Sequence, residues 1–198
     1  MISDHPTSGG VHIFDNFIDP ENASLIEKFI LKHPKIVQNE LTDDGINYVS
    51  TVTKDEYGQE YSQPSLLVDA DEELNNLMIP YIEKTKQHIE FVWRRTVGYE
   101  NGFNICGYQK GERLRAHYDG FKKDLATPAG YESRDISSVL YLNSGFTGGV
   151  LSFTNLGISL SPKRGMLALF PSSEMYTHEV SAVESGVRYF VTQFWCLQ

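Results

Sequence analysis

The sequence is poor in cysteine, in basic residues and in long apolar runs, and each scarcity excludes a class of protein. It has 2 cysteines among 198 residues, too few for a disulfide framework and without the CxxC spacing of a zinc site. Its 17 basic residues against 26 acidic ones give a formal net charge of −9, whereas a nucleic-acid-binding surface needs clustered Lys and Arg. No apolar run approaches the roughly 18 residues of a membrane span, and Met1–Gly10 lacks the basic and apolar regions of a signal peptide. We therefore expect a soluble cytoplasmic protein that binds neither nucleic acid nor membrane.

The rest of the composition is that of an ordinary globular chain. Hydrophobic residues make up 40% and charged residues 22%, and 11 Tyr with 11 Phe supply bulky core material. A chain of 198 residues is predicted to form a single domain, residues 1–198.

Two helical patterns occupy the first half of the chain. Val11–Phe17 alternates apolar and polar residues like an edge strand, and Asp19 is then placed as the N-cap of a helix over Pro20–His33. A second helical pattern runs from Asp69 to about Arg95, and Pro80 is expected to kink it. We expect this helical support to cover about residues 11–97.

From residue 98 onward, short β-like runs alternate with Gly, Pro, Asn and Ser. About eight strands are predicted: Phe103–Tyr108, Leu114–Tyr118, Ile136–Leu142, Val150–Thr154, Ile158–Leu160, Met166–Phe170, Thr177–Val183 and Val187–Trp195. Strands at near-regular spacing with no intervening helices indicate a sandwich or barrel core over about residues 98–198. The predicted class is α+β, mainly β, with two supporting N-terminal helices.

The first candidate site is His117 with Asp119. Residues i and i+2 of a strand point to the same face, so the imidazole and the carboxylate can converge on one point. On its own this pair is equally typical of a solvated strand face.

His178, on another predicted strand, strengthens the case for a metal. Two imidazoles and one carboxylate form the facial set that suits non-haem Fe(II), with three positions left open. Zinc more often takes four protein ligands, or three at another spacing, and calcium prefers more oxygens. Considered alone, His178 in an apolar strand would be assigned to the core.

Arg188 follows His178 across a turn-like segment. If Thr177–Val183 and Val187–Trp195 form a hairpin folded near Ser185, Arg188 lies about 13 Å along the strand from His178. An Arg at that position can bind the far carboxylate of a short dicarboxylate whose near end chelates the metal. Tyr108 is a candidate hydroxyl donor to the same carboxylate. The alternatives are an ordinary edge-strand arginine and a core tyrosine.

Beyond these residues, a longer series of motifs resembles the iron(II)- and 2-oxoglutarate-dependent dioxygenases of the prolyl 4-hydroxylase type. The resemblance covers roughly residues 102–195 with order and spacing preserved. Its motifs are Tyr108-Gln-Lys-Gly111, His117-Tyr-Asp119, Val139-Leu-Tyr-Leu-Asn143, Gly148-Gly149-Val-Leu-Ser-Phe153, Ser161-Pro-Lys-Arg-Gly165, Leu169-Phe-Pro-Ser172, His178-Glu-Val180 and Gly186-Val-Arg188-Tyr189.

The resemblance implies a double-stranded β-helix, or jelly roll, with Fe(II) held by His117, Asp119 and His178. It implies that Arg188 binds the C5 carboxylate of 2-oxoglutarate, with Tyr108 and a serine at position 137 or 138, Ser137 being preferred, nearby. The implied reaction uses O₂ to convert 2-oxoglutarate to succinate and CO₂ and hydroxylates an unactivated C–H bond, with ascorbate as the reductant that keeps iron reduced.

Several positions depart from the family pattern. Leu114 stands where many prolyl hydroxylases have a substrate-facing tyrosine, and Val150-Leu151 replaces a polar Glu-Thr pair. Asp119 is retained, which favours hydroxylation over halogenation. Phe194 stands where nucleic-acid demethylases of the wider superfamily have a second arginine.

The predicted substrate is a peptidyl residue, a free amino acid or another small metabolite. Residues 120–134 follow the metal motif directly and are a candidate lid, in which Lys122, Lys123 or Arg134 would contact an acidic group of the substrate. The alternative from another class is a non-catalytic cupin-like module that binds a metal or ligand. Such a module has no use for a carboxylate clamp formed by Arg188 and Tyr108.

Overall fold

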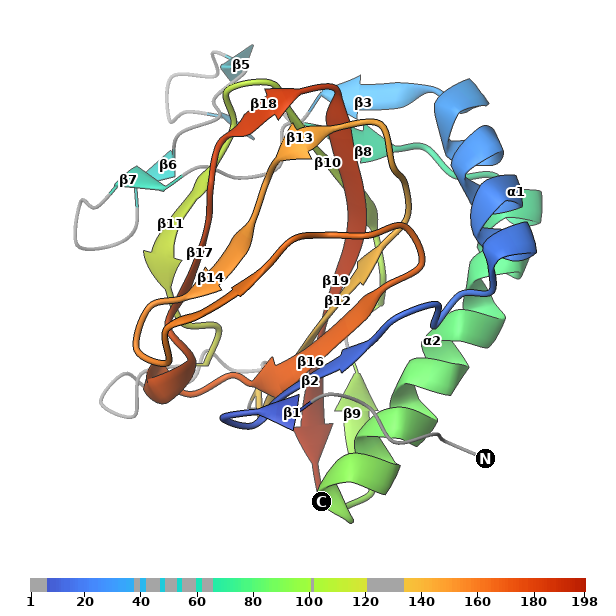
Figure 1. Ribbon diagram of the computed structural model, residues 1–198. Helices are drawn as coiled ribbons and strands as arrows, with labels where there is room; N and C mark the ends of the chain where they lie inside the picture. Colours follow the sequence, from blue (N-terminus) through green and yellow to red (C-terminus); the bar gives the residue numbers. More distant parts are fainter. Residues whose placement is uncertain are drawn as a thin grey trace.

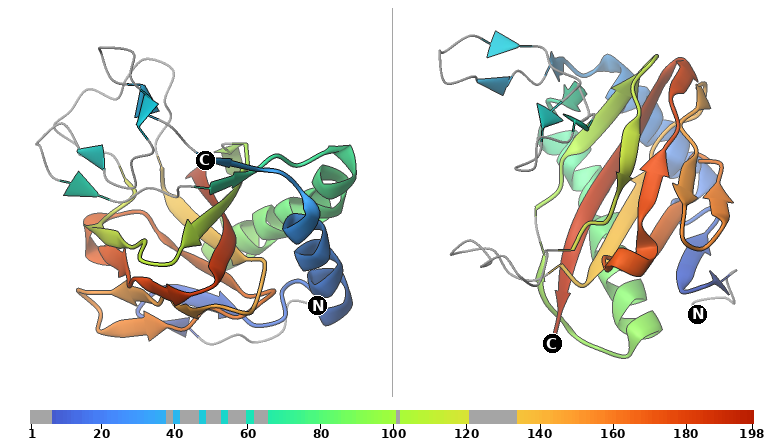
Figure 2. Two further views of the ribbon diagram at one scale, coloured as in Figure 1. Left: turned by 90° about the horizontal axis from the view of Figure 1, so that it is seen from above. Right: turned by 90° about the vertical axis from the view of Figure 1, so that its left-hand side faces the viewer.

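The structure is a computed structural model that describes residues 7–37, 40–41, 47–48, 53–54, 60–61, 66–100, 102–120 and 134–198. Two α-helices, α1 (Pro20–Lys32) and α2 (Glu72–Trp93), precede most of the β structure. Figures 1 and 2 show the helices along one side of the molecule and a smaller sheet on the other, with a large sheet between them.

The large central sheet, called the major sheet below, has nine strands, and its pairs are antiparallel. Along its main path the order is β1 (Thr7–Ser8), β2 (Val11–Phe14), β16 (Leu167–Pro171), β12 (Ile136–Tyr141), β19 (Val187–Leu197), β10 (Ile105–Gln109), β8 (Leu66–Val68) and β3 (Lys35–Val37). The ninth strand, β9 (Val97–Glu100), pairs with β19.

The minor sheet has four strands in the order β11 (Leu114–His117), β17 (His178–Val180), β14 (Leu151–Phe153) and β15 (Ile158–Leu160). Three two-stranded pieces complete the described β structure: β13 (Thr147–Gly148) with β18 (Val183–Ser185), β4 (Glu40–Leu41) with β5 (Asn47–Tyr48), and β6 (Thr53–Lys54) with β7 (Glu60–Tyr61). A short 3₁₀ helix, η1 (Glu174–Tyr176), leads into β17. Two facing antiparallel sheets with two helices outside them form the predicted jelly roll.

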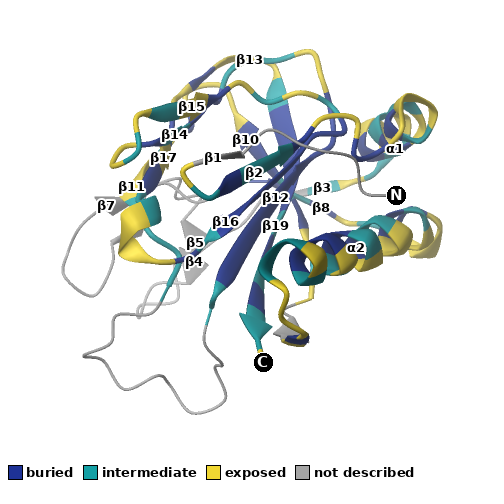
Figure 3. Ribbon diagram, turned by 60° about the horizontal axis from the view of Figure 1, so that its bottom comes forward, coloured by how far each residue is buried: buried dark blue, intermediate teal, exposed yellow. Residues whose placement is uncertain are grey.

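Strand β12 shows why the major sheet is the centre of the molecule. All six of its residues are buried, because helices cover one face of the sheet and the minor sheet covers the other (Figure 3). Side chains alternate between the faces, so Leu140 joins the core under the helices while Val139 and Tyr141 join the core between the sheets.

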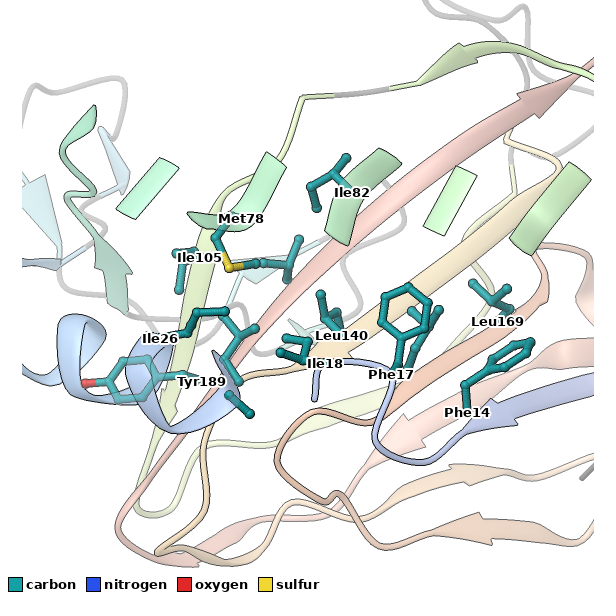
Figure 4. Close-up of a cluster of buried hydrophobic side chains, with 14 of the residues drawn as sticks. Phe14, Phe17, Ile18, Ile26, Met78, Ile82, Ile105, Leu140, Leu169 and Tyr189 are labelled. Carbon is teal, nitrogen blue, oxygen red and sulfur yellow. The ribbon is translucent and has the colours of Figure 1, made fainter. Parts of the chain in front are cut away.

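The first of these cores joins α1 and α2 to the major sheet (Figure 4). Ile26 from α1 and Met78 from α2 are fully buried there, and Tyr189 of β19 lies at the same contact. Fully burying one such aliphatic side chain contributes about 1.5–3 kcal/mol, so this contact fixes the helices on the sheet.

The helix boundaries follow local signals in the sequence. Asp19 caps α1 by accepting a hydrogen bond from the Asn22 backbone N–H at 3.0 Å, and Pro20 occupies the first turn. Asp71 caps α2 in the same way through Leu74, at 2.9 Å. Both helices therefore begin within a few residues of the predicted positions.

The predicted hairpin between Thr177–Val183 and Val187–Trp195 is wrong. Within the described residues, β17 pairs with β11 and β14 in the minor sheet, whereas β19 pairs with β10, β12 and β9 in the major sheet. The chain crosses between the sheets because the middle of β19, from Arg188 to Val191, is buried on both faces and needs a partner strand on each edge. Gly186, at φ +73°, makes the turn before this crossing.

Most of residues 35–67 lies outside the described residues, which include here the short strands β3 to β7 and part of β8. Among the residues that the structure describes, no helix combines the length and the apolar character needed to cross a membrane.

Candidate metal centre and ligand pocket

Three predicted ligands meet at one end of the minor sheet. His117 ends β11 and His178 begins β17, and the two residues are direct partners across the strand pair. The ligand atoms of His117, Asp119 and His178 all lie within 4.8 Å of one another. The Asp119 carboxylate lies between the imidazoles, 3.2 Å from His117 Nε2 and 3.7 Å from His178 Nε2.

The backbone orients both imidazoles toward the same point. Nδ1 of His117 lies 2.9 Å from the Arg115 carbonyl oxygen, and Nδ1 of His178 lies 2.9 Å from the Tyr176 carbonyl oxygen. A carbonyl oxygen only accepts, so each Nδ1 donates and each Nε2 faces the carboxylate. This is the arrangement in which histidines bind a metal through Nε2, each with its other nitrogen held by a hydrogen bond.

The same contacts set the charges of the three groups. Burial opposes a charge on His117, but the hydrogen bond to Asp119, the negative charge of Asp119 and the backbone hydrogen bonds together outweigh burial and raise the pKa of His117. Burial against Phe153 and Phe170 lowers the pKa of His178, which Asp119 only partly opposes. Burial acts to raise the pKa of Asp119, but the hydrogen bond with His117 and the nearby imidazoles lower it. Two imidazole nitrogens and an anionic oxygen are donors that fit Fe(II).

A cavity of about 490 Å³ adjoins these ligands, within the range of small-molecule sites. Its lining comes from both sheets: Cys106, Tyr108, Leu114, His117, Tyr118, Asp119, Arg134, Val139, Leu151, His178, Val180, Arg188, Phe190, Thr192 and Phe194. Burial raises the pKa of the Cys106 thiol to about 11, so this thiol stays protonated near neutral pH and competes poorly for a metal. A second cavity of about 630 Å³ lies on the outer surface between α1 and α2 and has no histidine in its lining.

Arg188 enters the cavity from the major sheet. It is 2% exposed and lies opposite Tyr108 in the register of β19 and β10. Its guanidinium carbon is 4.4 Å from the ring centre of Phe190, 4.9 Å from that of Tyr141 and 5.5 Å from that of Tyr108. These rings offset part of the cost of burying a cation. Among the residues that the structure describes, Nε and Nη1 of Arg188 have no hydrogen-bond partner, which leaves two buried donors for an anion.

Tyr141 belongs to this group, although the sequence reasoning missed it. It is fully buried on β12, and its hydroxyl also has no hydrogen-bond partner within the described part of the chain. The alternation of side chains along β12 could have indicated this position, since Val139 and Tyr141 point to the same inner face of the sheet. What the sequence did not show was that β12 lies beside β19, where Tyr141 is paired with Phe190. Burial raises the pKa of the Tyr108 phenol, so it remains a donor at neutral pH.

Ser137, predicted to lie near the cosubstrate, contacts a candidate metal ligand. Its hydroxyl hydrogen-bonds to Asp119 and lies 2.7 Å from the Ser172 hydroxyl, and it is not part of the cavity lining. Ser138 points to the opposite face, where its hydroxyl accepts a hydrogen bond from Trp195 Nε1 at 2.9 Å. The structure thus gives Ser137 contacts that hold a candidate metal ligand.

One wall of the cavity is a row of apolar side chains. Leu114, Val180 and Leu151 are cross-strand neighbours in the minor sheet, directly beside the row that contains His117 and His178. Both departures from the family pattern, at Leu114 and at Leu151, therefore contribute to one apolar surface that excludes water.

Arg134 lies at the other side of the cavity. Its guanidinium carbon is 3.9 Å from the ring centre of Phe194, and Nη1 donates to the Asp119 carbonyl oxygen at 3.4 Å. The part of the candidate lid from residue 121 to residue 133, which includes Lys122 and Lys123, lies outside the described residues.

Comparisons with known proteins match the part of the chain that contains this candidate site. Residues 103–196, just under half of the chain, match the model of the 2OG-Fe(II) oxygenase superfamily. Prolyl 3-hydroxylase 2 from Gallus gallus and from Homo sapiens are each 36% identical to this chain over 75 residues. The aligned stretch is 35% of this chain and only 11% of each of those proteins.

Solved structures resemble nearly the whole chain. The viral collagen prolyl hydroxylase of Paramecium Bursaria Chlorella virus-1, in its 2OG complex, has a TM-score of 0.62 at 19% identity and covers 94% of this chain and 95% of its own. A Trichoplax adhaerens prolyl hydroxylase bound to a hypoxia inducible factor peptide has a TM-score of 0.64 at 17% identity, with 94% and 83% covered. At these identities the likeness establishes the shared fold.

Proposed function

We propose that the protein is an Fe(II)- and 2-oxoglutarate-dependent hydroxylase, because residues 103–196 match the model of the 2OG-Fe(II) oxygenase superfamily. His117, Asp119 and His178 would hold the iron. When bound, the iron supplies the chemistry by which O₂ converts 2-oxoglutarate to succinate and CO₂ and hydroxylates an unactivated C–H bond of the substrate. Ascorbate is proposed as the reductant.

The observation that carries this proposal is a pair of buried Arg188 donors, Nε and Nη1, which have no hydrogen-bond partner among the described residues and belong to the same cavity as the His-Asp-His group. A cation without a counter-ion in an enclosed site is costly unless an anion binds it. Arg188, with the hydroxyls of Tyr108 and Tyr141, would bind the distal carboxylate of 2-oxoglutarate. A cupin-like module that only holds a metal would not need this group.

The remaining side chains of the site position these groups and keep the site dry. Ser137 holds the Asp119 carboxylate, and the Tyr176 carbonyl fixes the His178 ring. The apolar row of Leu114, Val180 and Leu151 would cover the methylene groups of the cosubstrate and exclude water, so that oxidation is directed to the substrate.

The test measures succinate formed by the purified protein with Fe(II), 2-oxoglutarate, O₂ and ascorbate. We expect succinate in the wild type and in a His33→Ala control, because His33 lies at the end of α1. We expect none in His178→Ala, which loses the metal, and a raised 2-oxoglutarate requirement in Arg188→Ala. Absence of succinate with a broad pool of amino acids and peptides, together with no spectral change on adding 2-oxoglutarate to the iron form, would refute the proposal.

The substrate is proposed to be a peptidyl residue or a free amino acid or small metabolite with an acidic group near the reacting carbon. Arg134 supports this, because its guanidinium lines the cavity beside the metal ligands. Matched acidic and neutral compounds compared for stimulation of succinate release should show a preference for the acidic member. Arg134→Ala should reduce that preference by about tenfold, the value of one charged hydrogen bond. An unchanged preference would remove Arg134 from substrate recognition.

The proposal includes the wider setting of the protein. Residues 1–198 are proposed to act as a single domain, since one hydrophobic core joins both helices to the major sheet. A cytoplasmic location is proposed because Cys106 and Cys196 are both free thiols.

A further inference from the structure

The arm of Arg188 is confined from two sides. On its own sheet, the rings of Tyr108, Tyr141 and Phe190 lie 4.4–5.5 Å from the guanidinium carbon. The backbone of Gly149, which lies between β13 and β14 in the chain, also comes close to this arm. The arm thus passes between three aromatic rings and a glycine.

A side chain at position 149 would collide with this arm. An ideal Cβ built on Gly149 lies 2.8 Å from Cδ of Arg188, 3.6 Å from its Nε and 3.5 Å from Val183 Cγ2. The first distance is shorter than real carbon contacts, and the guanidinium at the end of the arm already packs against the rings of Tyr141 and Phe190, which limits where the arm can move.

The backbone at Gly149 has little freedom to move away. Its N–H donates to the Ala182 carbonyl oxygen at 3.2 Å. In the next residue, the Val150 N–H donates to the Ser181 hydroxyl at 3.0 Å, and the Val150 carbonyl oxygen accepts from the Ser181 N–H at 2.9 Å. An added methyl group would therefore displace the guanidinium rather than the strand.

We infer that Gly149 is a positioning residue for 2-oxoglutarate binding: its missing side chain leaves the space in which Arg188 extends to the distal carboxylate. The inference rests on the proposed function of the site. It explains a part of the Gly148-Gly149 motif that the metal and the carboxylate clamp leave unexplained.

Gly157 provides a matched control. It lies in the turn between β14 and β15 with φ +65°, nearly the φ of +63° at Gly149. A Cβ on Gly157 has no atom of the described residues within 4 Å, so Gly157→Ala introduces the same backbone strain without the collision.

The experiment measures binding of 2-oxoglutarate by calorimetry to protein loaded with Mn(II) in place of Fe(II). We expect Gly149→Ala to weaken 2-oxoglutarate about tenfold or more, the loss expected for a displaced charged hydrogen bond, and Gly157→Ala to change it less than about twofold. The dissociation constant of Mn(II) itself should be the same in both variants. Binding of 2-oxobutyrate, which lacks the distal carboxylate, should also be unchanged by Gly149→Ala.

A double-mutant cycle separates positioning from general damage. In an Arg188→Ala background the arm is gone, so adding Gly149→Ala should cost no further affinity for 2-oxoglutarate. If Gly149→Ala alone does not fold, the double variant should fold, because the colliding side chain has been removed. Additive losses in the cycle, equal losses in the two glycine variants, or failure of the double variant to fold would overturn the inference.

The same titrations keep this inference distinct from the proposed function. A wild-type protein that binds no 2-oxoglutarate would contradict the proposed function itself. A wild type that binds it, with Gly149→Ala binding equally well, would contradict only the role of Gly149.

Discussion

At the scale of single residues, the behaviour of the metal centre depends on Asp119. Its carboxylate lies between two imidazoles whose pKa values shift in opposite directions. The contacts of His117, chiefly with Asp119, raise the pKa of His117 against the effect of burial, whereas burial lowers the pKa of His178. At pH values below the raised pKa of His117 and above the lowered pKa of His178, the metal-free site therefore holds a charged His117 beside the carboxylate and a neutral His178. One proton has to leave before both imidazoles can act as ligands.

This arrangement predicts the pH dependence of metal binding. A metal competes with the proton on His117 but not with one on His178, so affinity for Mn(II) should fall as the pH decreases below the raised pKa of His117. The logarithm of the dissociation constant should change by about one per pH unit there. Calorimetry from pH 5.5 to 8 measures it, with NMR titration of the metal-free imidazoles as a control. A slope of about two near neutral pH would contradict the neutral state of His178.

At the scale of elements, helix and strand positions follow local signals, whereas strand pairing does not. Each of the eight predicted β-like runs overlaps a strand, and each helix begins directly after a capping aspartate. The hairpin expectation failed because a turn before Gly186 does not specify which sheet receives the next strand. Burial of β19 on both faces decides that pairing, and burial depends on strands β10 and β12, which are distant in the sequence.

Helix α2 carries a proline that its fold does not require. Pro80 is exposed inside the continuous helix Glu72–Trp93, where it cannot donate the backbone hydrogen bond of its turn. Pro80→Ala should raise the free energy of unfolding by about 2 kcal/mol, the helical cost of proline less its effect on the unfolded chain. Urea denaturation measures this change. Glu83→Ala, exposed on the same helix, should stay within about 0.5 kcal/mol. A destabilised Pro80→Ala would show that the proline has a structural use.

At the scale of the whole molecule, the site is assembled from two sheets. The candidate metal ligands come from the minor sheet and the residue just after β11, whereas Arg188, Tyr108 and Tyr141 come from the major sheet. A ligand that contacts both groups connects the sheets and stabilises their packing. Metal and cosubstrate should therefore act together on stability.

We predict that Mn(II) and 2-oxoglutarate together raise the melting temperature more than the sum of their separate effects. At ligand concentrations of about 100 times each dissociation constant, the two ligands together contribute more than about 5 kcal/mol, so the combined shift should exceed about 10 °C. Arg188→Ala should keep the shift caused by Mn(II) and lose the additional shift, because the contact with the major sheet is gone. Differential scanning calorimetry measures these shifts. Strictly additive shifts in the wild type would contradict a ligand bridge between the sheets.

The sequence by itself determined the elements, the fold class and the set of candidate ligands. Residue type and short-range periodicity carry that information: His117 and Asp119 share a strand pattern, and caps and alternation are local. Only the tertiary structure decided that β19 crosses to the major sheet and that Tyr141 packs against Arg188. The contact of Ser137 with Asp119 and the approach of Gly149 to the Arg188 side chain also come from the tertiary structure alone. These are contacts between segments far apart in the chain, and they are selected by burial and packing of both sheets rather than by any local signal.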